Sequence, residues 1–473
     1  MGQGDRRHPS RRATWLPVLL VLLLLGGAGA AYLTGVSDRW APDETPDPVR
    51  EPAAVPPPEG MDIAAVPRPE PVAEAAEAGP LLRAAVRRTL TAALADRDLG
   101  PSVHAGVAAL GEGRPAYSTG SGTFTPASTL KLATAAAALA VLGPDHRFET
   151  TVVARGQSLT LVGGGDPMLA RVAPGTDDWP RVADVRTLAR QTAAALRGRK
   201  PVRLSYDASL FSGPSASPYW RADYIPDDIV SPIGALWVDE GIAADRSERV
   251  ADPAADAAAA FATALAEQGV KVRGAVTAAM APGGARALAA VSSPPLAQIA
   301  EHVIEVSDNE GAEVLAHHVG LAVLDDGSFG GGAEGVRRTL ADLGVPLDGA
   351  VIRDGSGLSR QNQVQAATLL EVLRVAAERP DLRAVVTGLP VGGFTGSLVF
   401  RFDQAPAAGV GRVRAKTGSL GGVRTLAGIA TDRAGTPMAF VLAADRIREP
   451  DMFKAEVDLD NLAGALGACR CSR

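Results

Sequence analysis

Positive charge is not in excess in this sequence. The 473 residues include 47 Lys and Arg against 53 Asp and Glu, which gives a net charge of -6 at pH 7 and a pI near 5.7. A nucleic-acid-binding protein normally presents a basic face, and no basic patch is visible in the globular part of the chain. The charge balance therefore excludes nucleic acid as an expected partner.

Cysteine is almost absent. The chain has only Cys469 and Cys471, at its extreme C-terminus. Export would permit a disulfide between them, but a Cys-x-Cys bridge closes a tight loop of unfavourable geometry. We therefore expect this pair to have no structural role in the core. No cysteine lies near the N-terminal apolar segment, so a lipid-attached N-terminus is not supported.

Motifs of several other site classes are missing as well. The stretch "GGGDP" lacks the lysine of a phosphate loop, and no Gly-x-Ser-x-Gly elbow occurs. Asp166 in that stretch is interpreted as a turn or inter-domain hydrogen-bond residue. Asp227 and Asp228 could recognise an amine on a peptide side chain, but solvation at the surface is the preferred interpretation. The histidines follow no metal-ligand spacing, and they are His8, His104, His146, His302, His317 and His318. No metal and no organic cofactor is expected.

The N-terminus predicts export. Four arginines precede an apolar run of 19 residues, Trp15 to Leu33. This length suits one membrane span better than a signal peptide, although the small residues 28–30 would also serve as a cleavage site. Because the positive charges stay cytoplasmic, residues 1–34 form a signal or anchor segment and the rest lies outside the cytoplasm, in the cell envelope. Anchoring to the cytoplasmic membrane is slightly favoured over cleavage and secretion.

The composition of residues 35–80 predicts a solvated linker. From Ala41 to Pro80 the chain has eleven prolines and nine acidic against two basic residues. Such a segment cannot bury enough apolar area to offset the entropy lost on ordering. We expect a disordered stalk that holds a folded unit away from the membrane.

The folded unit that follows has a mixed α/β pattern without a long-period repeat. Apolar residues recur at helical spacing in 79–100, 182–198, 256–269, 296–306 and 307–324. Strand-like runs occur at 102–110, 148–154, 158–165, 201–207, 411–420, 425–432 and 438–445. A last helix closes the chain.

Three short motifs carry the chemistry. Ser128 and Lys131 stand three residues apart at the start of a helix rich in Ala and Leu, Ser307-Asp308-Asn309 lies between two helices, and Lys416-Thr417-Gly418-Ser419 lies on a strand. Each alone is common, as a solvated lysine, a helix cap or a surface turn. In this order they are the constellation of the serine penicillin-recognising enzymes.

Burial of Lys131 has a chemical reason. A serine hydroxyl needs a base within hydrogen-bond reach, and positions i and i+3 share one helix face. An ordinary lysine, with a pKa of about 10.4, is almost wholly protonated at neutral pH. Burial in the apolar helix and a second cation, Lys416, would lower the pKa of Lys131 toward neutrality.

The chain resembles the D-alanyl-D-alanine carboxypeptidases/endopeptidases of the class C penicillin-binding proteins, peptidase family S13. "LVGGGDPML" (161–169), "DGSGLSRQN" (354–362) and "LPVGGFTGSL" (389–398) look like further signatures of that family. The resemblance implies a penicillin-recognising α/β fold, an antiparallel sheet flanked by helices. The catalytic domain would comprise 81–142 and 291–473, and 143–290 would be an inserted domain, shorter than is usual. Thr395 stands where family members tend to have an acidic residue.

The residues and the resemblance together suggest a role for each motif. Lys131 would be the base that activates Ser128, and Lys416 the fixed charge that attracts the substrate carboxylate. Ser307 would relay a proton to the departing amine, and Asn309 would hold a substrate amide.

The remaining motif residues complete the expected site. Thr417 and Ser419 would offer hydroxyls to the substrate carboxylate. By resemblance, and because Ser128 starts a helix, the backbone N–H groups of Ser128 and Ser419 would form the oxyanion hole.

These expectations amount to an exported serine carboxypeptidase that acts on peptidoglycan stem peptides ending in D-Ala-D-Ala. It would form an acyl-enzyme on Ser128, be inhibited by β-lactam antibiotics and act on cross-links as an endopeptidase as well. A β-lactamase is the alternative of the same fold, although no Glu-x-x-Leu-Asn segment follows Ser307. A catalytically silent wall-binding or sensor module is the other alternative, and the intact motif set argues against it.

Overall fold

The computed structural model describes residues 80–111, 114–173, 175, 179–196, 201–403 and 409–472. The expected signal or anchor segment 1–34 and the expected linker up to residue 79 lie outside these residues. Within the described part of the chain, no helix is both long enough and apolar enough to cross a membrane.

A five-stranded sheet in the order β2-β1-β10-β9-β8 forms the centre of the fold, and every pairing in it is antiparallel. Leu426 to Ala430 of β9 and Met438 to Ala444 of β10 are continuous runs of small and apolar residues, and all of them are buried. Such runs indicate strands covered on both faces. The strands are β1 Ser102–Ala109, β2 Tyr117–Thr119, β8 Val413–Leu420, β9 Val423–Thr431 and β10 Pro437–Asp445.

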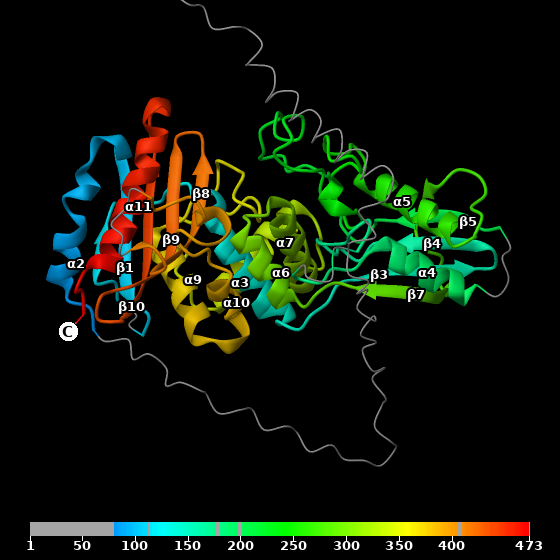
Figure 1. The fold of residues 1–473 in the computed structure, drawn as a ribbon, viewed down its shortest axis with the longest axis horizontal. Helices are drawn as coiled ribbons and strands as arrows, with labels where there is room; N and C mark the ends of the chain where they lie inside the picture. The colour runs from blue at the N-terminus through cyan, green and yellow to red at the C-terminus, as the bar shows by residue number, and fades with distance from the viewer. Residues whose placement is uncertain are drawn as a thin grey trace, which may run out of the picture. The chain divides into compact units, whose positions relative to one another are not determined.

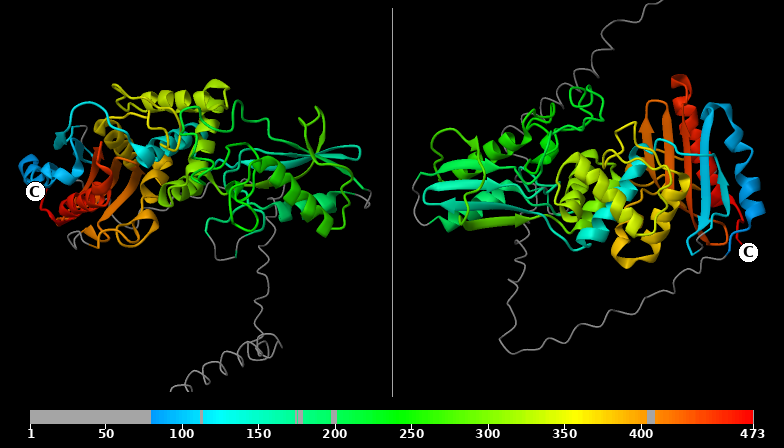
Figure 2. Two further views of the ribbon diagram at one scale, coloured as in Figure 1. Left: turned by 90° about the horizontal axis from the view of Figure 1, so that it is seen from above. Right: turned by 180° about the vertical axis from the view of Figure 1, so that it is seen from behind.

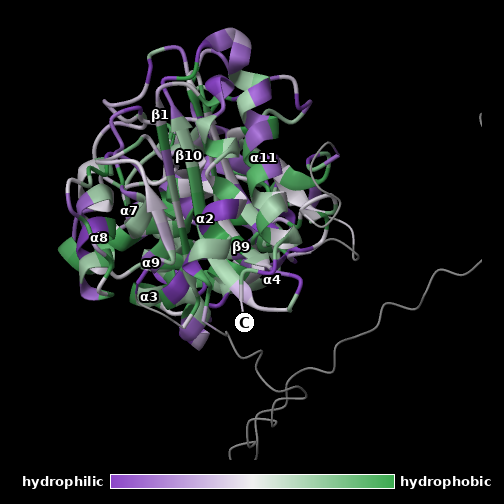
Figure 3. Ribbon diagram, turned by 90° about the vertical axis from the view of Figure 1, so that its left-hand side faces the viewer, coloured by the Kyte–Doolittle hydropathy of each residue, from purple (hydrophilic) through white to green (hydrophobic). Residues whose placement is uncertain are grey.

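Helices cover both faces of this sheet, as Figure 1 and Figure 2 show. On one face lie α2 (Arg83–Leu90) and α11 (Met452–Ala468), which share a core with the sheet. Figure 3 shows hydrophobic residues along β1 and β10 and hydrophilic ones on the outer parts of the neighbouring helices. The opposite face carries a helical layer made of α3 (Leu130–Leu142), α6 (Leu296–Glu305), α7 (Asn309–Leu324), α8 (Phe329–Asp342), α9 (Ala366–Glu378) and α10 (Ala384–Thr387).

α3 lies at the centre of that helical layer. Its sequence "LKLATAAAALAVL" is apolar on every side, and its first ten residues, Leu130 to Leu139, are all buried. A helix that is apolar all round is one that is buried all round, and alanine lets α6, α7, α8 and α9 approach closely. Lys131 is thereby placed in the core at the helix start.

A second sheet is formed by residues between 149 and 292, in the order β6-β5-β4-β3-β7. β3 pairs antiparallel with β4 and β7, while β4-β5 and β5-β6 are parallel. α4 (Val185–Ala195) and α5 (Pro253–Glu267) share a core with it. The strands are β3 Glu149–Arg155, β4 Ser158–Val162, β5 Arg203–Asp207, β6 Thr277–Ala278 and β7 Arg286–Ser292.

The fold class is the predicted one, an α/β structure with an antiparallel sheet flanked by helices. Every strand-like run of the sequence forms a strand, and the expected helix after residue 79 ends at Leu90 and continues as two 3-10 turns, Ala93–Ala95 and Arg97–Leu99. Residues 80–472 belong to one compact unit. The division at 142/143 and 290/291 stays a prediction.

The C-terminal cysteines depart from expectation. Cys469 and Cys471 form a disulfide, with an S–S distance of 2.07 Å, and Cys471 is fully buried in the core beside α2 and α11. The backbone holds it there, because Leu82 donates its N–H to the carbonyl of Cys471 (2.7 Å) and Asp432 accepts the N–H of Cys471 (3.0 Å). The expectation that this pair has no part in the core was therefore wrong.

Candidate active site

Ser128 lies in a 3-10 turn, Ala127–Thr129, that leads directly into α3. Ala127 adopts a positive φ of 47°, a backbone conformation that non-glycine residues rarely adopt. The turn is held by the carbonyl of Pro126, which accepts hydrogen bonds from the hydroxyls of Thr129 (2.7 Å) and Thr425 of β9 (2.9 Å). This anchorage fixes the serine at the end of the central sheet.

Two glycines make room for the serine turn. A Cβ on Gly418, the glycine of the third motif, would collide with the hydroxyl of Thr425 and the carbonyl of Pro126. A Cβ on Gly357, whose φ is +87°, would collide with the carbonyl of Ala127. Both positions need glycine because the backbone passes so close. The glycine of Lys-Thr-Gly therefore has a packing reason.

Lys131 donates three hydrogen bonds from one buried ammonium. Its Nζ lies 3.0 Å from Ser128 Oγ, 2.8 Å from Asn309 Oδ1 and 2.8 Å from the carbonyl of Ser356. The side chain is fully buried, and burial lowers its pKa to about 8, although nearby carboxylates oppose the shift. The expected contact between the serine and a lysine of lowered pKa is thus present.

A buried loop that carries the carbonyl for Lys131 was not predicted as part of the site. Glu313 of α7 accepts the N–H groups of Gly355 (3.0 Å) and Ser356 (2.8 Å). Asp354 accepts hydrogen bonds from the N–H groups of Gly357 (2.9 Å) and Ser359 (2.6 Å). The sequence marked 354–362 only as a family signature, and an acidic residue inside an apolar helix was the available signal for Glu313.

The second motif connects α6 to α7. Ser307 has a positive φ of 64°, and Asp308 caps α7 by accepting the N–H of Gly311 (2.8 Å). Asn309, expected to hold a substrate amide, accepts from Lys131 and donates from Nδ2 to the carbonyl of Ile229 (3.3 Å). Its amide is therefore engaged within the protein. In the described residues, no hydrogen bond joins the Ser307 side chain to Ser128 or Lys131.

The third motif places Lys416 on β8, fully buried, with Nζ 3.1 Å from the carbonyl of Thr417. Burial, and next the charge of Lys131, hold the pKa of Lys416 well below its ordinary value. This differs from the expectation that Lys416 lowers the pKa of Lys131. Nearby carboxylates favour the charged form of Lys131, whereas no carboxylate of the described residues pairs with Lys416. The repulsion between the two amines therefore lowers the pKa of Lys416.

The partly or fully exposed motif residues line one cavity of about 520 Å³. Thr417 is oriented by a hydrogen bond from its Oγ1 to Ser397 Oγ (3.0 Å). Two arginines at this cavity, Arg221 and Arg360, had no sequence signal, because a lone arginine in a loop is common. The lining residues are Ser128, Arg221, Tyr224, Ile229, Ser307, Asn309, Leu358, Arg360, Thr417, Ser419, Leu420 and Gly421.

Other residues singled out in the sequence do not line this cavity. Asp166 is a turn residue, as expected, since its Oδ1 accepts the N–H of Met168 (2.9 Å). Asp228 pairs with Arg249. Thr395 closes a turn by accepting the N–H of Val391 (3.0 Å), so it serves the loop that carries Ser397.

The tandem histidines are core residues. His317 and His318 are buried, and burial lowers the pKa of each to about 4. His318 stacks on Phe148 at 4.1 Å between ring centroids and bonds the carbonyl of Gly165 (2.9 Å). His317 packs against the rings of Phe211 and Phe329, so both histidines are neutral packing elements of the core.

The sequence of this chain is similar to those of known carboxypeptidases. The model of the D-Ala-D-Ala carboxypeptidase 3 (S13) family matches residues 86–248 and 243–466. A carboxypeptidase of Mycobacterium tuberculosis is 37% identical over 367 residues, covering 74% of this chain and 76% of that protein. Carboxypeptidase DacB of Mycolicibacterium smegmatis is 34% identical over 479 residues and covers 98% of each chain.

The fold is also found in a solved structure. The crystal structure of penicillin-binding protein 4 from Haemophilus influenzae matches with a TM-score of 0.63 and 23% identity, covering 80% of this chain and 98% of that one. A further crystal structure of that protein contains a bound β-lactam.

Proposed function

The chain belongs to the S13 family of D-Ala-D-Ala carboxypeptidases, a family of serine hydrolases, and from this we propose that it removes the terminal D-alanine of peptidoglycan stem peptides through an acyl-enzyme on Ser128. One observation carries the assignment of the nucleophile. Ser128 Oγ lies 3.0 Å from the Nζ of Lys131, a lysine that is fully buried. A serine beside a desolvated amine is an activated nucleophile.

In the proposed acylation, Ser128 Oγ attacks the carbonyl carbon of the penultimate D-alanine and its proton passes to Lys131 Nζ. The N–H groups of Ser128 and Ser419 stabilise the resulting oxyanion. The C–N bond then breaks, and the departing D-alanine amine takes up a proton relayed by Ser307. Water attacks the ester in a second step and releases the shortened peptide and free Ser128.

Lys416 acquires its role when substrate binds. In the free protein its pKa is held well below the ordinary value by burial and by Lys131. A substrate carboxylate that enters beside it favours the charged form and raises that pKa again. Thr417 and Ser419 add hydroxyl donors, so a free C-terminal carboxylate is bound by a charge-assisted hydrogen bond.

In the free protein Asn309 orients Lys131, and its contact with the substrate forms only on binding. Its Oδ1 accepts a hydrogen bond from Nζ, which orients the amine toward Ser128, while its Nδ2 bonds a carbonyl weakly at 3.3 Å. That long bond leaves Nδ2 able to exchange its partner for a substrate carbonyl. Asn309 can thus hold a substrate amide as well as orient Lys131.

β-Lactams follow the same path, because they present an acyl carbon and a carboxylate to the same groups. The β-lactam complex of the Haemophilus influenzae protein supports this extension. Cross-linked peptides would place a larger amine in the leaving position of the same reaction.

Export from the cytoplasm fits a peptidoglycan substrate. The arginines and the apolar run of residues 1–34 support export, and they favour a membrane anchor over a cleaved signal peptide.

One experiment separates the candidate functions. The purified full-length chain is incubated with a fluorescent penicillin and, separately, with a peptide ending in D-Ala-D-Ala and with a cross-linked dimer of it. A stable adduct on Ser128, found by mass spectrometry, with release of D-alanine, supports the proposal. Rapid turnover of the penicillin favours a β-lactamase, and no adduct with no cleavage favours a silent binding module. Label on Ser307 or Ser356 would overturn the choice of nucleophile.

A further inference from the structure

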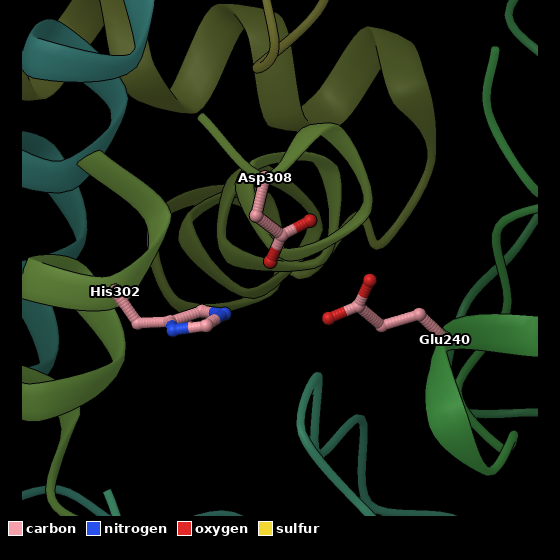
Figure 4. Close-up of side chains that lie close together, drawn as sticks. All are labelled: Glu240, His302 and Asp308. Atoms are coloured by element: carbon pink, nitrogen blue, oxygen red, sulfur yellow. The ribbon is translucent and has the colours of Figure 1, made fainter. Parts of the chain in front are cut away.

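Three side chains from three separate elements meet beside the second motif. Glu240 lies in a 3-10 turn, Asp239–Gly241, His302 lies on α6, and Asp308 precedes α7. One nitrogen or oxygen atom of each lies within 4.8 Å of the others. Figure 4 shows the imidazole ring and the two carboxylates directed toward a common space. The histidine spacing of the sequence did not indicate this group, because the fold alone brings His302 to the two acids.

Asp308 contributes a buried oxygen that receives no hydrogen bond within the described part of the chain. Its residue is only 7% exposed, and Oδ1 is used to cap α7 through the N–H of Gly311 (2.8 Å). Oδ2 is buried and accepts no hydrogen bond from any described residue. Gly311 leaves room for it, since a Cβ there would collide with that oxygen. A buried carboxylate oxygen without a donor is unfavourable unless another group satisfies it.

The surroundings are short of positive charge. Arg249, the neighbouring cation, is engaged by Glu310 at 2.5 Å and by Asp228 at 3.8 Å. No Lys or Arg of the described ranges forms an ion pair with Glu240 or Asp308, and no hydrogen bond from them reaches the Glu240 carboxylate or the His302 ring. Glu240 and Asp308 bring two carboxylates close together, and a bound cation would offset the repulsion between them.

We propose that Glu240, His302 and Asp308 bind a divalent transition-metal ion of the zinc class. Zinc binds imidazole nitrogens and carboxylate oxygens, and a site with three protein ligands leaves a fourth position for water. Imidazole disfavours calcium and magnesium, which prefer all-oxygen sites. Zinc ligands about 2.1 Å from the metal lie about 3.4 Å apart in a tetrahedron, and Glu240 and His302, both partly exposed, can move inward to reach it.

The ion would act on the second motif. It would tie the turn at Glu240 to α6 and to Asp308, which stands between Ser307 and Asn309. Ser307 has a positive φ, and such a conformation persists only where the surroundings hold it. The proposed metal is therefore a positioning element for Ser307 and Asn309, and it takes no part in bond making or breaking.

The test measures zinc binding directly and does not depend on activity. The purified full-length chain is stripped with a chelator, dialysed and titrated with zinc chloride by isothermal calorimetry, and its metal content is measured by mass spectrometry. We expect one zinc per chain. His302→Gln and Glu240→Gln should each weaken binding at least about tenfold, since even groups that only orient zinc ligands contribute that much. Cobalt loading should give the visible absorption of a nitrogen- and oxygen-bound tetrahedral ion.

Two control variants locate the binding. His146→Gln replaces a partly exposed histidine away from the group and should leave the affinity for zinc unchanged. Asp458→Asn alters the second acidic group of the described residues, Asp96, Asp98 and Asp458, and should also leave it unchanged. The metal-free melting temperatures of all variants show that each is folded. The absence of stoichiometric zinc, or equal affinity in the wild type and His302→Gln, overturns the proposal.

Discussion

Asn309 Oδ1 lies 2.8 Å from Lys131 Nζ, although 178 positions separate the two residues in the chain. The contact joins the start of α7 to the start of α3. It leaves Lys131 with its three donor hydrogens directed to Asn309, Ser128 and the carbonyl of Ser356. The amine that activates the serine is thus positioned by the second motif.

Removal of the Lys131 amine should slow acylation strongly. Lys131→Met keeps the length of the side chain in the core but leaves Ser128 without a base, so the rate of penicillin acylation should fall by about 100- to 10,000-fold. Stopped-flow fluorescence with a labelled penicillin measures it. Lys454→Met, at an exposed lysine, is the control and should react like the wild type. A Lys131→Met rate within about tenfold of the wild type would place the base elsewhere.

The pH dependence of acylation should follow Lys131. Burial lowers its pKa to about 8, and only the neutral amine can accept the serine proton. The rate should therefore rise with pH from 6 to 8, by up to about tenfold per unit, and level off above about 8. Second-order rate constants for penicillin at six pH values test this. A rate that falls across that interval contradicts the assignment of Lys131 as the base.

Lys416 should distinguish substrates by their C-terminal carboxylate. Lys416→Gln should slow cleavage of a free-acid peptide by about 30- to 1000-fold, equivalent to about 2 to 4 kcal/mol, because a charge-assisted hydrogen bond is lost. The amidated peptide should be a poor substrate for the wild type and change little with the mutation. Values of kcat/KM for both enzymes on both peptides give the comparison. Equal losses on the two peptides would assign Lys416 to the chemistry at Ser128.

Gly357 should prove indispensable for the serine turn. An alanine there meets the carbonyl of Ala127 and adopts an unfavourable positive φ, so Gly357→Ala should lower the free energy of unfolding by about 2 to 5 kcal/mol and slow acylation. Gly122→Ala is a matched control, because Gly122 also has a positive φ (+82°) but faces open space. It should cost only about 1 to 2 kcal/mol. Urea denaturation measures both, and equal losses in the two variants would show that the collision is relieved.

The sequence by itself determined the local features of this protein. The Ala and Leu content of α3 predicts burial on all sides, and the three-residue spacing of Ser128 and Lys131 places both on one helix face. Strand-like runs of the sequence predict seven strands of the two sheets, whereas β2, β6 and β7 were not predicted. The order of the three motifs predicts the family and the serine chemistry, since each motif is a short stretch whose geometry depends on near neighbours.

Only the tertiary structure decided which distant groups meet. Spacing along the chain carries no information on the contact of Asn309 with Lys131, on the loop held by Glu313, or on the grouping of His302 with Glu240 and Asp308. The pKa of Lys416 likewise depends on burial and on surrounding charges, which several elements supply together. Side-chain contacts and the local dielectric environment arise from packing between elements, so they become defined only when the chain is folded.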